Sequence, residues 1–275
     1  MIPPAGKCVW GCDSGKPFNQ EHIIGKHVAK ALDISFPVPM NWGDIHRSTG
    51  EIVDHGERLE DELKIVLADR VCERCNGQWM RKLDKRMLQF MWNTLRHEER
   101  VQLNAGKQQT LALWATKVGL LLALWFHDQP FDAEHLGPSF APADNFLAVG
   151  KHMRPPERTR IWIGAIAPTV SVREFSMSAS ALYEIPTDAE PIPRGYYTVV
   201  QLKRLVLFVT GWELDYADYV GQGPNAEAIV RARALSRIWP MSERVVEWPP
   251  PSYLESDDLD NLVKAQPSGV QPAQS

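Results

Sequence analysis

The chain has 275 residues, of which 44% are hydrophobic and 23% are charged, and it carries a formal net charge of -4 with a pI of about 6.1. This composition is that of an ordinary globular protein with a substantial core in one or two domains. It excludes a strongly basic surface over the whole molecule, so binding to nucleic acid would need a local basic patch.

The first 71 residues predict several short elements. Residues 1–24 predict a hairpin with a turn near residues 13–17, residues 26–32 predict a short helix, and residues 63–71 predict a strand rich in branched side chains. Residues 1–7 lack the charged-then-apolar order of a signal peptide, so we expect a cytoplasmic protein.

Two helices are expected next, at residues 76–100 and 107–127, packed as an antiparallel pair. The apolar residues of the first helix recur at intervals of three and four, which predicts one buried stripe. The stripe consists of Met80, Leu83, Met87, Met91 and Leu95. The other side carries Arg81, Lys82, Lys85, Arg86, Arg96 and Arg100, either as phosphate contacts or as a solvated helix face.

Residues 111–126 form an apolar run that is shorter than the roughly 20 residues of a membrane span. Lys117 lies in its middle, where a bilayer would impose a cost of about 2.5–3.5 kcal/mol. We therefore expect a buried core helix and no membrane partner.

The pattern changes after residue 130. Residues 158–167, 173–184 and 196–210 predict strands separated by Pro and Gly turns, which favours an antiparallel sheet. Helices are expected at residues 226–236 and 254–265. The predicted fold class is therefore α+β.

All four cysteines fall into two short pairs, Cys8 with Cys12 and Cys72 with Cys75. Each pair can offer two sulfurs to the same tetrahedral zinc ion, and paired cysteines in the cytoplasm are more often metal ligands than disulfides. The alternative is four free buried thiols. One zinc ion bound by both pairs would close a loop far longer than the ~15–20 residues of a minimal zinc ribbon.

Closing that loop would bring Glu21 and His22 against the start of the helix that carries Asn76. A carboxylate and an amide oxygen are suitable ligands for a hard divalent cation such as Mg²⁺. An imidazole with an ordinary pKa of about 6.5 can deprotonate water at neutral pH. Neighbouring side chains of a strand point to opposite faces, so Glu21 and His22 need an irregular strand end to share one site.

These motifs resemble the zinc-containing branch of the HNH endonucleases. The resemblance rests on Cys-x-x-x-Cys, then Glu-His-Ile-Ile, then Cys-x-x-Cys-Asn-x-x-Trp-Met-x-x-Leu-Asp from Cys72 to Asp84. More loosely, LWATK at 113–117 and IWP at 238–240 are similar to segments of uncharacterised bacterial and phage HNH proteins.

The resemblance implies a ββα-metal core that hydrolyses DNA, or RNA by the same chemistry. It implies Glu21 and Asn76 as ligands of a catalytic Mg²⁺ or Mn²⁺ and His22 as general base. It also implies a structural Zn²⁺ site formed by Cys8, Cys12, Cys72 and Cys75.

The chain departs from the family at the middle residue, usually an Asn shortly before the second cysteine pair. Asp69, Asn41 and His46 are the candidates for that place, and the sequence does not choose between them. This departure favours one alternative, a zinc-binding module that binds nucleic acid or protein without cleaving it. A further alternative is a ribonuclease or a nuclease toxin acting on tRNA.

The expected domain organisation follows from these assignments. We expect a zinc-stabilised HNH nuclease module at residues 1–103, a connecting core helix at 104–130 and a C-terminal α+β domain of unassigned role at 131–265. A disordered tail is expected at 266–275, because it is polar and contains proline.

Overall fold

The computed structural model describes residues 6–12, 15–34, 38–46, 52–60, 66–91, 100–128, 135–136, 143–170, 175–184, 192–212, 234–241 and 244–263. Its elements are β1 (Phe18–His22), α1 (Lys26–Ala31), β2 (Val38–His46), β3 (Ile52–Glu60), β4 (Val66–Cys72), α2 (Glu73–Cys75), η1 (Asn76–Met80), α3 (Arg81–Met91), β5 (Val101–Leu103), α4 (Ala105–His127), β6 (His135–Leu136), α5 (Ala143–His152), β7 (Thr159–Ala165), β8 (Phe175–Glu184), β9 (Ile192–Leu202), β10 (Leu205–Trp212), β11 (Leu235–Trp239), β12 (Val246–Trp248) and α7 (Ser256–Val263). The fold is α+β, as the sequence predicts.

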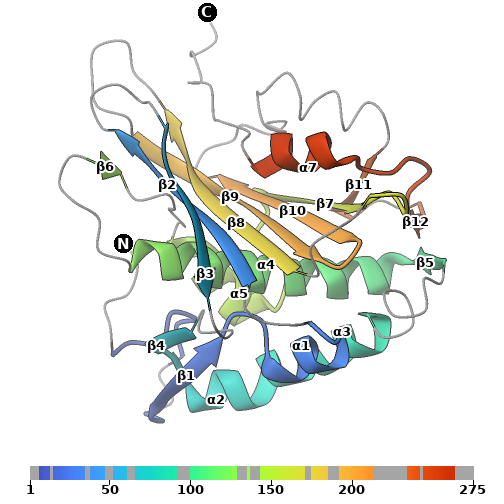
Figure 1. Ribbon diagram of the computed structural model, residues 1–275. Coiled ribbons are helices and arrows are strands. Elements are labelled where there is room, and N and C mark those ends of the chain that lie inside the picture. The colour runs from blue at the N-terminus through green and yellow to red at the C-terminus, as the bar shows by residue number, and fades with distance from the viewer. Residues whose placement is uncertain are drawn as a thin grey trace, which may run out of the picture.

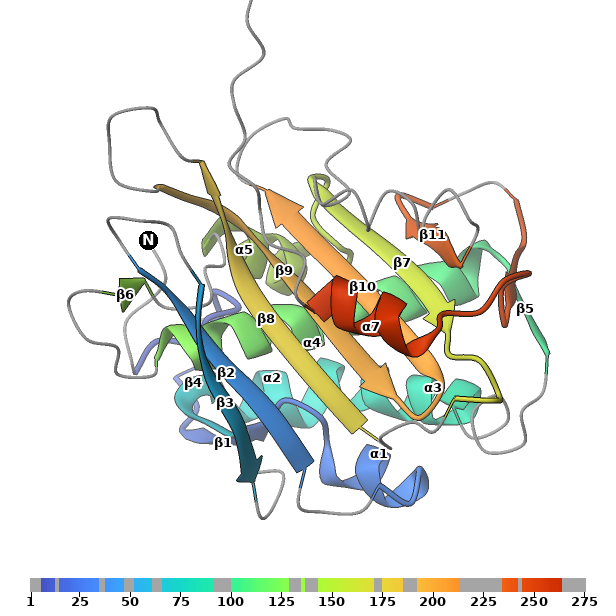
Figure 2. The same cartoon turned by 45° about the horizontal axis from the view of Figure 1, so that its top comes forward.

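The largest sheet has five strands in the order β11-β7-β10-β9-β8, and every neighbouring pair is antiparallel. Helix α7 covers one face of this sheet and α4 runs across the other face (Figure 1). The hairpin of β2 and β3 lies alongside β8 at the edge of the sheet (Figures 1 and 2).

Alternating apolar side chains explain why the sheet is covered on both faces. In β10, Leu205, Leu207 and Val209 join the core on the α4 side, while Val206 and Phe208 join a second cluster with residues of the α7 segment. Successive side chains of a strand point to opposite faces of the sheet. A strand whose side chains are apolar on both faces is therefore buried on both faces.

Helix α4 is the central element of the molecule. It lies between the five-stranded sheet and a lower layer that contains α1, α3, β1 and β4 (Figure 1). Because neighbours cover it on both sides, the residues from Leu111 to Leu124 are buried all round, as expected of a core helix. Within the described part of the chain, no helix is long and apolar enough to cross a membrane.

The lower layer begins with a two-stranded sheet in which β1 pairs antiparallel with β4. The chain then continues directly from β4 into the helical run of α2, η1 and α3. Met80, Leu83 and Met87 of this run are buried, which confirms the first part of the predicted apolar stripe. The side chain of Met91, together with Leu95 and Arg96, lies outside the described residues.

Several expectations about the elements are wrong in detail. The hairpin expected at residues 1–24 is replaced, in its described part, by a turn at residues 8–11 and by β1, which takes β4 as its partner. The strand expected at 196–210 is a hairpin of β9 and β10, with Lys203 in the left-handed region at φ 51°. The helix expected at 226–236 ends in residues that belong to β11, and its part up to residue 233 lies outside the described residues.

Candidate functional site

Three of the four cysteines meet at the junction of β4 and α2. Cys8 begins a turn in which the Gly11 amide donates to the Cys8 carbonyl at 3.0 Å. This turn is fastened to β4 because the Val9 amide donates to the carbonyl of Arg70 at 3.0 Å. Cys72 ends β4 and Cys75 lies one turn later in α2, so the strand-to-helix junction presents both sulfurs on the same side as Cys8.

The spacing of the sulfurs fits a metal ion. The Sγ atoms of Cys8, Cys72 and Cys75 all lie within 4.8 Å of one another, and those of Cys8 and Cys75 are 3.8 Å apart. Four sulfurs at the usual zinc distance of about 2.3 Å form a tetrahedron with edges of about 3.8 Å. These three buried cysteines could therefore hold a metal ion.

The electrostatics of the cluster favour a thiolate at Cys8. Hydrogen bonding with the Cys75 thiol lowers the pKa of Cys8, burial opposes this shift, and backbone hydrogen bonds at Cys72 and Trp10 lower the pKa further. The pKa of Cys75 is raised, because it hydrogen-bonds to the Cys8 sulfur and is buried. Since the thiolate is the form that ligates metals, Cys8 is prepared for binding.

Cys12, the fourth expected ligand, lies outside this group of mutually close sulfurs. It is only half-buried and follows the turn that carries Cys8. The structure therefore confirms part of the predicted site: it brings the sulfurs of Cys8, Cys72 and Cys75 together, and the place of Cys12 as fourth ligand stays a prediction.

The candidate site for catalysis begins at β1. Its pairing with β4 shifts between Asn19 and Glu21, which is a local irregularity of the ladder. Beyond the shift, Glu21 is opposite Leu67 and His22 is opposite Val66 in regular pairing. Glu21 is buried with 4% of its surface exposed, whereas His22 is half-buried.

Asn76 lies beside Glu21 at the start of the helical run. Its side-chain amide donates to the Asn19 side-chain oxygen at 3.1 Å and also hydrogen-bonds to the Glu21 carboxylate. The structure therefore brings together Glu21 and Asn76, two residues that the sequence assigns to one site. The junction between β4 and α2 places Asn76 directly after Cys75, so the cysteine cluster and the carboxylate share one scaffold.

A buried ion pair supports this corner from the core. The Lys117 ammonium of α4 donates to Oδ1 of Asp84 at 2.8 Å, and the Trp114 indole donates to the same oxygen at 2.9 Å. Lys117 is fully buried and Asp84 is 4% exposed. A charged pair in this environment persists only when hydrogen bonds satisfy both ions.

The charges of Lys117 and Asp84 also affect the pKa of Glu21. Burial raises the pKa of Glu21 to about 7, the Lys117 ammonium opposes that rise, the Asp84 carboxylate adds to it, and the hydrogen bond from Asn76 lowers it. Sequence reasoning treats Lys117 only as an argument against a membrane span. The available signal is a lone lysine in an apolar helix, which needs an acidic partner when the helix is buried.

The candidates for the middle residue are only partly described. Asp69 is exposed, lies in the left-handed region at φ 57°, and its carbonyl accepts a hydrogen bond from the Gly6 amide. Asn41 and His46 belong to β2, whose side chains lie outside the described residues. The choice between these residues stays a prediction.

Comparisons with known proteins give no relative: no family model, curated protein or solved structure matches this chain.

Proposed function

We propose that this chain is a metal-dependent nuclease of the HNH type. The observation that carries the proposal is the buried Glu21 carboxylate next to Asn76, on a strand–strand–helix arrangement of β1, β4 and α2–α3 that also carries a metal-competent cysteine cluster. The resemblance implies a hairpin followed by a helix; here β1 and β4 pair antiparallel with α1, β2 and β3 between them in the chain, and the helical run follows β4.

The cysteine cluster would hold a structural zinc ion. Cys8, Cys72 and Cys75 supply three thiolates, and Cys12 would complete the tetrahedron from its position after the turn. Zinc bound here would fix the N-terminal turn to the junction of β4 and α2. The junction in turn fixes Asn76 against Glu21.

Glu21 and Asn76 would hold a divalent cation, Mg²⁺ or Mn²⁺, which supplies charge to stabilise the phosphate and the leaving oxygen. His22 takes a proton from the attacking water. A new P–O bond forms from that water, the ester P–O bond breaks, and the departing oxygen takes a proton from solvent. The substrate is DNA, and RNA would undergo the same first steps.

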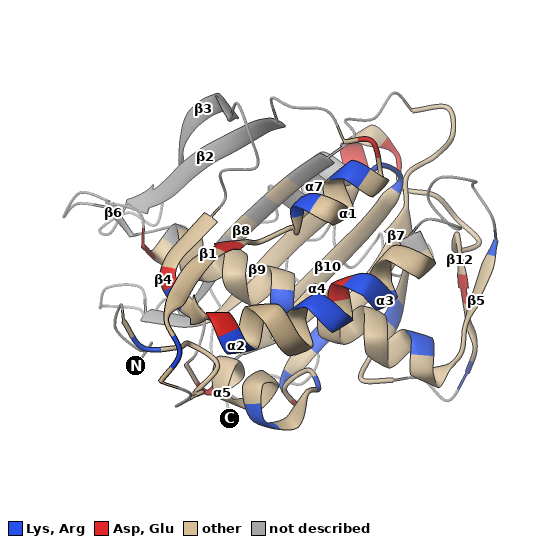
Figure 3. Cartoon of the chain, turned by 90° about the horizontal axis from the view of Figure 1, so that it is seen from below, with Lys and Arg blue, Asp and Glu red and all other residues tan. Residues whose placement is uncertain are grey.

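The surface around the site suits a polyanion. Arg81, Lys82, Lys85 and Arg86 are exposed on α3, and Lys26 and Lys30 are exposed on α1. Figure 3 shows these basic segments along α1 and α3 on one side of the molecule. Such residues would bind phosphates without reading sequence, which supports a local basic patch on a chain of net charge -4.

The test is a plasmid-nicking assay across Mg²⁺, Mn²⁺ and Zn²⁺, with zinc content measured on the same preparation. His22→Ala should lower nicking at least a hundredfold, since general-base catalysis contributes typically 10²–10⁴-fold, and it should leave zinc content and melting temperature unchanged. His152→Ala, at an exposed histidine of α5, is the matched control. Undiminished nicking by His22→Ala would refute the role of the base.

One observation favours a second candidate, a zinc-stabilised module that binds nucleic acid or protein without cleavage. The irregularity of β1 precedes Glu21, so Glu21 and His22 pair regularly with Leu67 and Val66. Strand alternation then directs the two side chains to opposite faces. Retention of duplex DNA on a column without nicking in any of the three metals would establish this alternative.

A further inference from the structure

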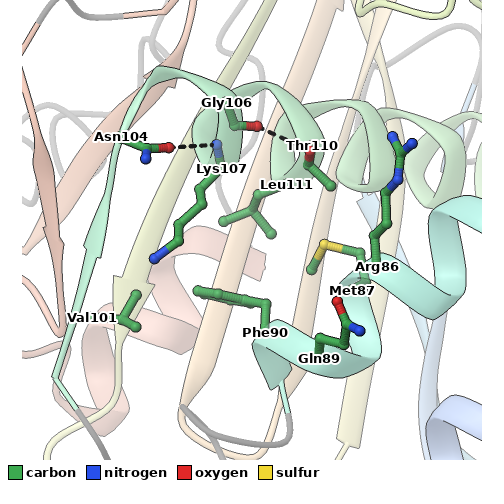
Figure 4. Close-up of a pocket in the computed structure, with 10 residues that line it drawn as sticks. All are labelled: Arg86, Met87, Gln89, Phe90, Val101, Asn104, Gly106, Lys107, Thr110 and Leu111. Carbon is green, nitrogen blue, oxygen red and sulfur yellow. Dashed lines mark hydrogen bonds between the residues drawn. The ribbon is translucent and has the colours of Figure 1, made fainter.

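A hollow of about 440 Å³ lies at the far end of α3 from the candidate site. We call it the α3–α4 pocket. It is lined by Arg86, Met87, Gln89, Phe90, Val101, Asn104, Gly106, Lys107, Thr110 and Leu111 (Figure 4). Its volume falls within the range of sites that bind small molecules. Phe90 follows Asn76 by 14 positions in the helical run, or about 20 Å along the helix axis.

The interior of the pocket is apolar. Met87, Phe90, Val101 and Leu111 supply its walls, and Figure 4 shows the Phe90 ring lying across the hollow below Leu111. Phe90 is only half-buried, whereas Met87 and Leu111 are buried. A half-buried aromatic ring beside a buried aliphatic wall offers a surface on which a flat, apolar group can pack.

The rim of the pocket is cationic. Arg86 and Lys107 lie on opposite sides of the hollow in Figure 4, and the described residues that line it include no carboxylate. The Lys107 ammonium donates to the carbonyl of Gln102 at 3.2 Å, which leaves two of its three donors for a ligand. The Asn104 side chain caps the start of α4, because its oxygen accepts a hydrogen bond from the Lys107 backbone amide at 3.0 Å. The positive charge at the rim therefore comes from the side chains of Arg86 and Lys107 and not from the helix start.

We propose that the α3–α4 pocket binds one unstacked nucleotide of a nucleic-acid strand. The base stacks on Phe90 under Leu111, and its phosphate lies against the Lys107 ammonium. Stacking on an aromatic ring combined with nearby cations is the usual way in which single-stranded nucleic acid is bound. The choice of a nucleotide rests on the proposed function, since the helical run of η1 and α3 carries Asn76 of the candidate site at one end and the pocket at the other.

The polar groups at the rim agree with this ligand. The Gln89 amide offers both a donor and an acceptor, as the edge of a base requires. Three further cations, Arg81, Lys82 and Lys85, are exposed along α3 between Asn76 and the pocket. A strand whose phosphate reaches Glu21 would therefore follow a positive path to Phe90.

Met87 provides a reporter for the test. The full chain, labelled with ¹³C at its methionine methyl groups and assigned with Met87→Leu, is titrated with deoxynucleoside 5′-monophosphates without added divalent cation. We expect the Met87 signal to shift at millimolar nucleotide, and the signal of Met80, buried near Asn76, to stay in place. Deoxynucleosides and inorganic phosphate, each alone, should shift Met87 less.

Two variants separate the parts of the pocket. Phe90→Leu keeps an apolar side chain against the core and should weaken nucleotide binding about fivefold or more, because base stacking is lost. Lys107→Gln should weaken binding of the monophosphate and leave that of the deoxynucleoside unchanged. Lys151→Gln makes the same charge change at an exposed position of α5 and should alter neither.

Three outcomes would overturn the proposal: a Met87 signal unmoved by every nucleotide and by a short single-stranded oligonucleotide, an equal shift with inorganic phosphate, or tighter binding of an alkyl carboxylate such as decanoate. The readout needs no cleavage, so it is independent of the nicking assay. Nicking of DNA without a Met87 shift would support the proposed function and refute nucleotide binding in the α3–α4 pocket. A Met87 shift without nicking would support nucleotide binding and refute the nuclease activity.

Discussion

At the scale of single residues, the charge of Glu21 is the property on which the proposed chemistry depends. Its carboxylate is buried, and its pKa of about 7 lies well above the ordinary value of 4.5. A protonated carboxyl is a poor metal ligand, so the proposed cation site should fill only as the pH rises toward neutrality. The same shift has a measurable effect on folding.

We expect stability to fall between about pH 4.5 and pH 7 when no divalent cation is added. The folded state keeps a proton on Glu21 in this range while the unfolded state has lost it, so rising pH favours unfolding by roughly 3 kcal/mol for a shift of this size. Glu21→Gln should flatten this part of the pH profile, measured by urea unfolding. Glu73→Gln, at an exposed glutamate of α2, should leave the profile unchanged.

The buried pair of Lys117 and Asp84 gives a second prediction at this scale. Lys117→Met leaves the Asp84 carboxylate buried without its cation and should cost about 3–5 kcal/mol in the free energy of unfolding. The double variant Lys117→Met with Asp84→Leu should recover much of that loss, because no charge is then stranded. A double variant no more stable than Lys117→Met would contradict the pairing.

Residue identities could be predicted from the sequence wherever a motif fixes them. The cysteine pairs, Glu21 and Asn76 follow from spacing and from the order of the motifs, and the structure places Glu21 beside Asn76. Lys117 could not be assigned, because its partner Asp84 is far away in the chain and only the packing of α3 on α4 brings the two together.

At the scale of elements, the turn that carries Cys8 depends on α5. Gly150 of α5 lies so close to Trp10 that an added Cβ would meet the Trp10 carbonyl. The Trp10 ring also packs on Phe146 of α5, with ring centroids 5.5 Å apart. The position of the cysteine cluster therefore rests on a helix from the C-terminal half of the chain.

Gly150→Ala should destabilise the protein by about 1–3 kcal/mol, the usual cost of overpacking, because backbone atoms would have to move. Gly77→Ala is the matched control: its Cβ would meet nothing within 4 Å, and alanine is the better helix former. Thermal unfolding of both variants checks this prediction. Equal melting temperatures would show that α5 does not press on the turn.

The helices were easier to predict than the strand pairings. Apolar periodicity is local, so the spacing of Met80, Leu83 and Met87 finds the buried face of its helix. The pairing of β1 with β4 is not local, because α1 and the β2–β3 hairpin intervene. A pattern of alternating residues shows that a segment is a strand but not which strand is its partner.

At the scale of the whole molecule, one continuous core joins the two halves. It includes Cys8 and Val71 from the lower layer, the buried residues of α4, and Leu207 and Val209 from the large sheet. Because α4 contacts both layers, we expect the chain to unfold as a single cooperative unit.

A fragment ending at residue 103 should therefore fail to fold, even with zinc present. It would expose the faces of α3 that pack on α4, and it would leave Asp84 without Lys117. The full chain should unfold in one transition, with coincident curves from far-ultraviolet circular dichroism and tryptophan fluorescence. A cooperatively folded fragment would instead support an independent domain at residues 1–103.

The spacing of the cysteines in the chain also suggests an order for metal binding and loop closure during folding. Cys72 and Cys75 are one helical turn apart and could capture an ion while the rest of the polypeptide is still loose. Cys8 can join them only after a loop of about 60 residues closes, at an entropic cost of roughly 3–4 kcal/mol. An ion would thus bind first to Cys72 and Cys75, and the N-terminal turn with Cys8 would complete the site last.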